Sequence, residues 1–170
     1  FIREVVEKLK GERVIAIGIS TMFDQVAQWG LSQGVEGVFG PGSRVMTGGG
    51  GKGAVLQDGW AERIKTFFGV DRLFSNYGMT EMTSLIIGCE HGHYHLPPWV
   101  TLFLLDPETG KPLPRTGTQT GRASFFDMTH DGTWGGVVTG DKVTAHWDAD
   151  CPCGRSTVYL EGDIRRFSEL

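Results

Sequence analysis

Two short clusters of cysteine and histidine carry side chains that bind metal ions. The first cluster, "CEHGHYH", spans residues 89–95, and the second, "CPC", spans residues 151–153. Thiolate and imidazole groups are common ligands of Zn²⁺, and the two clusters contain every cysteine of the chain. We therefore expect a zinc site, and the expected ligands are Cys89, His95, Cys151 and Cys153.

The spacing of the first cluster requires the chain to turn back on itself. In an extended segment Cys89 and His95 would lie about 20 Å apart, so both can bind one ion only if the chain reverses, which Gly92 permits. His91 or His93 could replace His95 as the ligand. Four protein ligands leave no open position for water, which predicts a structural role for the zinc. In the alternative interpretation, the histidines form a polar loop and the cysteines are core thiols.

A second segment, "LFSNYGMTEMTS" at 73–84, combines an aromatic ring, a glycine, a hydroxyl and a carboxylate. These groups belong to Tyr77, Gly78, Thr80 and Glu81. Such a segment is either a turn between core elements or a site for a nucleotide and its metal ion. A Tyr-Gly pair after a strand is more often a turn when it stands alone.

The glycine cluster "TGGGGKG" at 47–53 resembles a phosphate-binding loop. It lacks the spacing of a P-loop, and no serine or threonine follows Lys52, so a Walker-type NTPase is disfavoured. Lys52 is better explained as a solvated or loop-fixing residue than as a catalytic one.

The elements that must position these residues alternate between strands and helices. Apolar runs predict strands at 13–20, 43–47 and 72–78, and helical spacing predicts helices at 22–34 and 56–69, with the second helix ending at Gly69. This alternation predicts parallel strands joined by crossover helices. Ligands of such sheets bind at the carboxyl ends of the strands, where the glycine cluster and "YGMTE" lie.

The pattern changes after residue 95. Strand-like runs there alternate with proline and glycine turns such as "DPETG", which predicts an antiparallel β subdomain. The expected fold is therefore α/β, with an α/β part over residues 1–95 and a β-rich subdomain over residues 96–170.

Composition excludes several classes of function. The 170 residues are 39% hydrophobic, which is enough for a globular core, and the formal net charge of −4 leaves no broad basic face for nucleic acid. No apolar run is long enough to span a membrane, and the odd number of cysteines suits a reducing, cytoplasmic location. Phe1 opens directly on a helical pattern, which suggests a piece of a longer chain. Whether the protein forms a homodimer is left open.

The order of the motifs resembles the adenylate-forming enzymes, which include acyl-CoA synthetases, luciferase and peptide synthetase adenylation domains. The matching elements are "VMTGGGGK", "NYGMTE", "DPETGKPLPRTGTQTG" and "VVTGDKV", in this order. Within that superfamily, "YGMTE", "TGD" and "CPCGR" are most similar to phenylacetate-CoA ligase and to bacterial acyl-protein synthetase. Cys/His clusters also occur in some relatives of phenylacetate-CoA ligase.

This resemblance implies ATP and Mg²⁺ as cofactors and assigns roles to the second segment. The ring of Tyr77 would stack on adenine, and Asn76 would read the adenine edge. Thr80 and Glu81 would be the catalytic pair, with the Thr80 hydroxyl on phosphate and the Glu81 carboxylate on Mg²⁺. Gly78 would let the backbone approach the nucleotide.

Further roles are implied for residues outside "YGMTE". The other face of adenine would be covered by Gly49, Gly50 and Gly51, and Asp141 would bind the ribose hydroxyls. Met79 and Met82 would line an acyl pocket, although methionines are more often core residues. One of Arg165 and Arg166 would approximate an arginine near the family's hinge, but the register does not choose between them.

The function implied is activation of a carboxylic acid as its acyl-adenylate, followed by transfer of the acyl group to a thiol of coenzyme A or a protein. The family's phosphate loop, of the form "SGTTGxPK", and its small C-terminal domain are missing from this sequence. The chain thus corresponds to a later part of the large domain and is expected to be inactive alone. The alternative is a non-catalytic, zinc-stabilised binding module that kept the scaffold of the nucleotide site.

Overall fold

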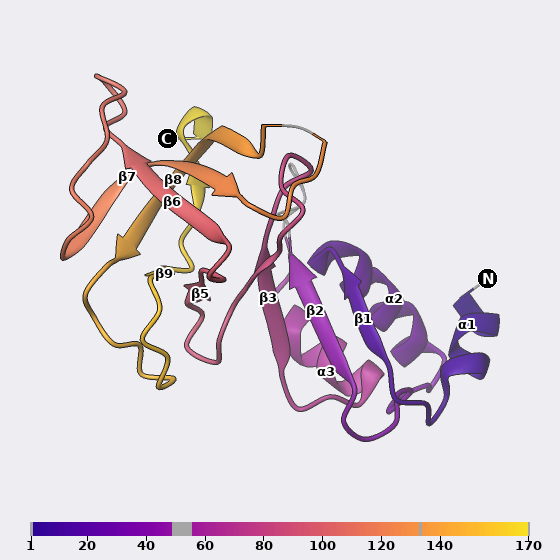
Figure 1. Cartoon of the computed structure of the whole chain (residues 1–170). Helices are drawn as coiled ribbons and strands as arrows, with labels where there is room; N and C mark the ends of the chain where they lie inside the picture. Colours follow the sequence, from indigo (N-terminus) through magenta and orange to yellow (C-terminus); the bar gives the residue numbers. More distant parts are fainter. Residues whose placement is uncertain (1, 49–55, 133, 170) are drawn as a thin grey trace. The chain divides into compact units, whose positions relative to one another are not determined.

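The helices and strands of the first half alternate as the sequence predicts. The computed structural model describes residues 2–48, 56–132 and 134–169. The chain divides into two compact units, one up to Ser75 and the other from Asn76 onward. In order, the first elements are α1 (Ile2–Leu9), β1 (Ile15–Gly18), α2 (Ser20–Ser32), β2 (Arg44–Gly48), α3 (Trp60–Phe68) and β3 (Leu73–Tyr77) (Figure 1).

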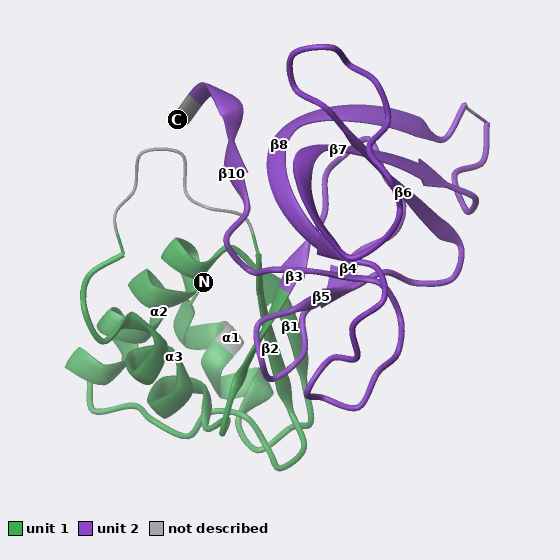
Figure 2. Ribbon diagram, turned by 90° about the vertical axis from the view of Figure 1, so that its left-hand side faces the viewer, with its two compact units in different colours: residues 1–75 green, residues 76–170 purple. Residues whose placement is uncertain are grey.

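A parallel strand pair forms the centre of the first unit. β1 pairs with β2 from Ile15 opposite Arg44 to Gly18 opposite Thr47, which confirms the predicted parallel pairing. The sheet has the strand order β1-β2-β3-β4, and the short β4 (Ile86–Ile87) is antiparallel to β3. Helices α2 and α3 lie on the same side of β1 and β2 (Figures 1 and 2).

The core of the first unit lies between these helices and the strands. Its buried members include Val45 from β2 and the aromatic rings of Phe67 and Phe68 from α3. Helices α2 and α3 approach closely at Gly30, where an added Cβ would lie 2.0 Å from the Phe67 ring. Helix α3 ends before Gly69, whose φ of 73° is the left-handed conformation that glycine favours, as the sequence predicted.

A buried ion pair also joins α2 to α3. Arg63 donates from Nε to Asp24 Oδ1 at 2.8 Å and from a second guanidinium nitrogen to Oδ2 at 2.9 Å. Asp24 is only 4% exposed, and the hydrogen bonds from Arg63 outweigh burial and lower the pKa of its carboxyl. The bidentate geometry sets the register of the two helices.

The second unit is built on an antiparallel sheet of order β5-β9-β8-β7-β6, with β10 paired to β8. Its strands are β5 (Tyr94–His95), β6 (Val100–Leu105), β7 (Thr118–Asp127), β8 (Gly136–His146), β9 (Tyr159–Leu160) and β10 (Arg165–Arg166), followed by a 3-10 helix at Phe167–Glu169. Alternate residues such as Leu102, Leu104, Ala123 and Phe125 are buried in one core. The β-rich texture predicted after residue 95 is confirmed.

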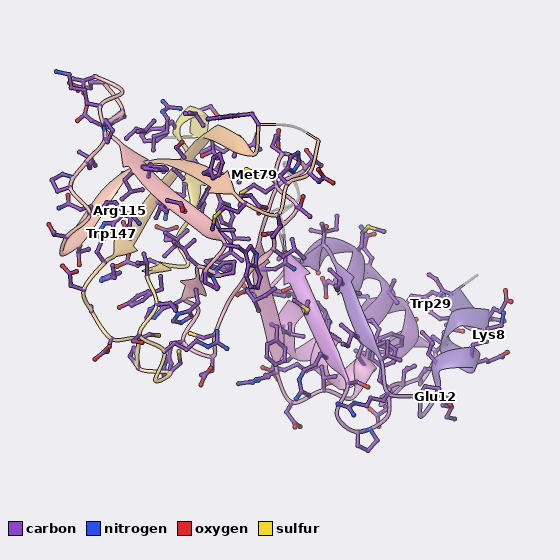
Figure 3. All side chains as sticks on the ribbon, in the orientation of Figure 1. Lys8, Glu12, Trp29, Met79, Arg115 and Trp147 are labelled. Carbon is purple, nitrogen blue, oxygen red and sulfur yellow. The ribbon has the colours of Figure 1, made fainter. Side chains whose placement is uncertain are left out.

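The end of β8 is covered by a basic side chain. The guanidinium carbon of Arg115 lies 5.0 Å from the ring centre of Trp147, the residue after β8 (Figure 3).

The two compact units divide after Ser75, whereas the sequence placed the change to a β-rich subdomain at residue 96. That domain boundary stays a prediction. Among the described helices, none has the length and apolar character needed to cross a lipid bilayer.

Candidate nucleotide site and Cys3His cluster

Tyr77 and Asp141, predicted from separate motifs, meet within the second unit. Tyr77 is the last residue of β3, and Asp141 lies in β8. The Tyr77 hydroxyl donates a hydrogen bond of 2.6 Å to Asp141 Oδ2. Burial and this hydrogen bond raise the pKa of Tyr77 above its ordinary value, so the phenol stays protonated and remains a donor. The structure thus places an aromatic ring and an oriented carboxylate side by side.

Arg166 also lies at this carboxylate. Its position follows from the pairing of β10 with β8, which sets Arg166 opposite Asp141 and Arg165 opposite Lys142. The Arg166 Nε lies 3.8 Å from Asp141 Oδ1. The sequence left both arginines outside the site, and the strand register is the signal that distinguishes them.

The segment after Tyr77 presents the predicted catalytic pair. Thr80 and Glu81 are exposed, and the Thr80 hydroxyl donates to Glu81 Oε2 at 3.2 Å. Gly78 is exposed beside them, while Asn76 lies in β3 opposite Ile87. The Thr80 hydroxyl and the Glu81 carboxylate are therefore both accessible to a ligand from solvent. The roles assigned to these residues stay predictions.

The two methionines of this segment pack inward. Met82 is buried in the core of the second unit, and Met79 lies partly buried against that core (Figure 3). Their predicted contact with an acyl substrate stays a prediction. Gly49, Gly50 and Gly51, predicted to cover adenine, lie outside the described residues.

A buried carboxylate from β7 holds the same segment, and the sequence analysis did not predict it. Asp127 is 1% exposed and accepts hydrogen bonds from the Ser84 backbone N–H at 2.8 Å and from the Ser84 hydroxyl at 3.1 Å. It also accepts from the backbone and the hydroxyl of Thr129, and Trp99 donates to the Ser84 hydroxyl at 2.9 Å. The chain just after Glu81 is therefore fastened to the end of β7.

These hydrogen bonds determine the charge of Asp127. Burial alone would raise the pKa of this carboxyl, but the donors from Thr129 and Ser84 outweigh it and lower the pKa to about 2. A second fastening lies nearby, because the Thr83 hydroxyl is 3.0 Å from Nδ1 of His130.

The cysteine clusters form two turns of the same kind. In the first knuckle, residues 89–92, the Cys89 N–H donates to the His93 carbonyl at 2.8 Å, and the Gly92 N–H donates to the Cys89 carbonyl at 3.0 Å. In the second knuckle, residues 151–154, Cys151 and Gly154 make the equivalent bonds at 3.2 and 2.9 Å. Both glycines have positive φ, 74° and 85°, which reverses the chain behind the leading cysteine.

Strand pairing brings the two knuckles together. Each knuckle precedes a short strand, and these strands, β5 and β9, pair with His95 opposite Tyr159. The ligand atoms of the four predicted residues all lie within 4.8 Å of one another. The members of this Cys3His cluster are Cys89, His95, Cys151 and Cys153. The structure brings the four residues together, and their role as zinc ligands stays a prediction.

The ring of His95 is oriented by a residue that the sequence analysis missed. Its Nε2 lies 3.3 Å from Cys153 Sγ, and its Nδ1 lies 3.0 Å from the hydroxyl of Thr157. Nε2 is therefore the atom available to a metal, with Nδ1–H able to donate to the hydroxyl, an arrangement typical of metal-binding histidines. His95 is buried, and desolvation lowers its pKa, so the imidazole is held neutral as a ligand must be.

His93 also contacts a thiol of the cluster. Its Nδ1 lies 3.2 Å from Cys151 Sγ, and its ring stacks on Tyr159 with ring centres 4.6 Å apart. His146 stacks on Tyr159 as well, at 4.7 Å, and its Nε2 lies 2.8 Å from Glu161 Oε1. The Cys151 thiol is thus contacted by His93, whose ring is held in place by Tyr159. His91 is exposed.

The two leading thiols differ in their affinity for a proton. Burial would raise the pKa of Cys89, but hydrogen bonds from the His91 and His93 backbones and from the neighbouring thiols lower it. Burial raises the pKa of Cys151 to about 11. Cys89 is thus the first thiol of the pair to become a thiolate.

No protein-family model matches the sequence, and no curated protein matches it. Solved structures do share its fold. A 2-hydroxyisobutyryl-CoA ligase, solved with 2-HIB-AMP and CoA, gives a TM-score of 0.68 at 17% identity over 97% of this chain and 35% of the ligase.

Two further structures are similar. ATP-bound MatB from Rhodopseudomonas palustris gives a TM-score of 0.60 at 19% identity, over 99% of this chain and 36% of MatB. The amide bond synthetase McbA from Marinactinospora thermotolerans gives 0.55 at 19% identity, over 99% of this chain and 37% of McbA. The chain spans about a third of the length of these enzymes. Its fold is that of the part of these enzymes that it matches.

Proposed function

We propose that the chain is part of an ATP-dependent ligase that forms an acyl-adenylate from a carboxylic acid and transfers the acyl group to a thiol of coenzyme A or of a protein. The observation that carries this proposal is the hydrogen bond between Tyr77 and Asp141, because it joins the two motif residues proposed to hold adenosine. The fold shared with a ligase solved with 2-HIB-AMP and CoA supports it. The motifs "YGMTE", "TGD" and "CPCGR" favour the phenylacetate-CoA ligase and acyl-protein synthetase branch.

Adenosine would be held by groups from β3 and β8. The Tyr77 ring would stack on the base, with Asn76 at its edge. Asp141 Oδ2 accepts a hydrogen bond from Tyr77, and Asp141 Oδ1 faces Arg166. These two contacts orient the carboxylate, which would accept hydrogen bonds from the ribose hydroxyls. Gly49, Gly50 and Gly51 would cover the other face of the base.

Phosphate would be met by the exposed segment after β3. The Thr80 hydroxyl, which donates to Glu81 in this structure, would turn to a phosphate oxygen, and the Glu81 carboxylate would become a ligand of Mg²⁺. Bound Mg²⁺ offsets the negative charge of the phosphates. The fastening of Ser84 to Asp127 would keep this segment in place, and Met79 and Met82 would lie at the acyl group.

The test uses the complete polypeptide that contains this chain, because the chain corresponds to about a third of the similar enzymes. We expect Glu81→Gln to reduce acid-dependent exchange of pyrophosphate into ATP at least tenfold while the melting temperature stays unchanged. Glu108→Gln, an exposed carboxylate in the β6–β7 connection, is the matched control and should keep full exchange. Equal exchange by the two variants would remove Glu81 from the metal role.

We also propose that the Cys3His cluster binds one structural Zn²⁺. Four protein ligands would close the coordination sphere, with bonds of about 2.3 Å to sulfur and about 2.0 to 2.1 Å to nitrogen. Protein purified without added metal should contain about one equivalent of zinc, and anomalous scattering at the zinc edge should peak at the cluster. Less than a tenth of an equivalent, or a peak elsewhere, would refute the site.

The cluster also favours a second candidate function, a non-catalytic, zinc-stabilised binding module. The four residues of the cluster all lie in the second unit, and none of them is among the residues proposed to bind the nucleotide. Nucleotide binding without any acid-dependent exchange by the complete polypeptide would favour this candidate. For either function we propose a cytoplasmic location, since three free cysteines suit a reducing compartment.

A further inference from the structure

Two thiols of the Cys3His cluster occupy equivalent positions and face each other. Cys89 leads the first knuckle and Cys151 leads the second, and their sulfur atoms lie 3.8 Å apart. The third thiol is engaged differently, because Cys153 Sγ lies 3.3 Å from His95 Nε2. Within the cluster, Cys89 and Cys151 are therefore the thiols placed to react with each other.

We propose that Cys89 and Cys151 form a reversible disulfide when a hydroperoxide oxidises the cluster, so that a covalent bond replaces the metal as the fastening between the two knuckles. This inference rests on the metal site proposed above and not on the ligase activity. It assigns the cluster a second, oxidised state in which the metal is released and the two knuckles stay joined.

The difference in exposure orders the two steps. Cys89 is partly exposed, whereas Cys151 is 3% exposed beneath His93. The Cys89 thiolate attacks one oxygen of hydrogen peroxide, which breaks the O–O bond, gives a sulfenic acid and releases hydroxide. The Cys151 sulfur then attacks the Cys89 sulfur and forms the S–S bond, and the sulfenic hydroxyl leaves as water with the proton of the Cys151 thiol. The hydroxide released in the first step takes up the proton that Cys89 lost, so two thiols lose two electrons and one peroxide is reduced to two molecules of water.

The alternative pair within the second knuckle is disfavoured by geometry. Cys151 and Cys153 are separated only by Pro152, so a bond between them would close a very small ring against a fixed proline φ. A bond between Cys89 and Cys151 closes a loop of 62 positions and ties together two segments that β5 and β9 already align. Long loops gain most from such a cross-link.

The metal cannot remain once this bond forms. Cys89 and Cys151 supply two of the four ligands, and a disulfide sulfur is no longer a thiolate. Only Cys153 and His95 would remain, which is too few for a structural zinc site. Oxidation should therefore release zinc and form the cross-link together.

The experiment compares three states of the chain by thermal unfolding and thiol titration. Zinc-loaded protein, metal-free reduced protein and metal-free protein treated with hydrogen peroxide are prepared. We expect the metal-free reduced protein to melt lowest and peroxide to raise its melting temperature by about 5 °C. Peroxide should leave one titratable thiol, and peptide mapping should recover Cys89 joined to Cys151. Dithiothreitol with zinc should restore the loaded state.

Two matched variants keep the result decisive. Cys153→Ser loses a metal ligand but keeps the reacting pair, so peroxide should still raise its melting temperature. Cys89→Ser loses the pair and should gain nothing from peroxide. A bond between Cys151 and Cys153, sulfinic acid in place of a disulfide, or equal responses of the two variants would overturn the proposal. If the chain binds no zinc but forms the cross-link, the zinc site and the replacement of metal by a disulfide are both overturned, and only the reactivity of the thiol pair is shown.

Discussion

The hydroxyl of Tyr77 lies 2.6 Å from Oδ2 of Asp141, although the two residues are 64 positions apart in the sequence. One residue ends β3 and the other lies in β8, so the bond forms only when the second unit is folded. It orients the carboxylate before any ligand arrives, which is an advantage for a binding site because less freedom is lost on binding.

The Tyr77 hydroxyl should therefore support both folding and nucleotide binding. Tyr77→Phe keeps the ring but leaves Asp141 without its donor, which should lower the free energy of unfolding by about 1.5–3 kcal/mol. Urea unfolding measures this change, and titration with adenosine nucleotide should show weaker binding. Tyr94→Phe is the control, because the Tyr94 ring also packs near Tyr77 but its hydroxyl makes no hydrogen bond among the described residues. Equal stability of the two variants would contradict the prediction.

The Asp127 carboxylate should make stability depend on pH in the acid range. Its pKa is lowered from 3.8 to about 2 in the folded protein, so the folded state binds its proton less tightly than the unfolded chain. The contribution, about 2 kcal/mol, is present above pH 4 and is lost as the pH falls toward 2. Asp127→Asn should be less stable at pH 7 and should lose less stability between pH 4 and 2. Asp131→Asn, an exposed neighbour, should follow the unsubstituted protein, and a matching pH profile for Asp127→Asn would disprove the role.

The close approach of α2 and α3 at Gly30 should not tolerate a methyl group. In Gly30→Ala the new Cβ would lie 2.0 Å from the Phe67 ring, which is itself fully buried. Overpacking of this kind costs about 1–3 kcal/mol, measured by denaturant unfolding. Gly140→Ala is the control, since a Cβ there meets nothing within 4 Å. A stable Gly30→Ala variant would mean that the helices can separate at little cost.

The hydroxyl of Thr157 should increase the affinity of the Cys3His cluster for zinc. It lies 3.0 Å from Nδ1 of His95, the ring nitrogen that does not face the thiols. Thr157→Val keeps the shape but removes the acceptor, and loss of such a partner weakens metal binding by about 10- to 100-fold. Competition with a chromophoric chelator measures the affinity. Ser156→Ala should bind zinc normally, and equal affinity of the two variants would show that Thr157 does not orient the ligand.

Local patterns in the sequence were enough to predict most of the elements and to single out the residues that form the Cys3His cluster. The apolar runs at 13–20 and 72–78 became β1 and β3, because β-branched and aromatic residues of that length favour strands. The four cluster residues were predicted from chemistry alone, since thiols and imidazoles so close in sequence can chelate with little chain closure. These inferences depend on neighbours along the chain.

The tertiary structure decided the choices that depend on distant segments. The pairing of β5 with β9 brought Nε2 of His95 to Cys153 and the hydroxyl of Thr157 to the other ring nitrogen. The register of β10 on β8 placed Arg166, rather than Arg165, at Asp141. The role of Asp127 could not be predicted from the sequence, because its hydrogen-bond donors at Ser84 lie 43 positions away and reach it only in the folded chain. A shift of one residue in the strand register turns every side chain of that strand to the other face of the sheet. Such contacts therefore follow from the packing of the whole sheet and not from any local pattern.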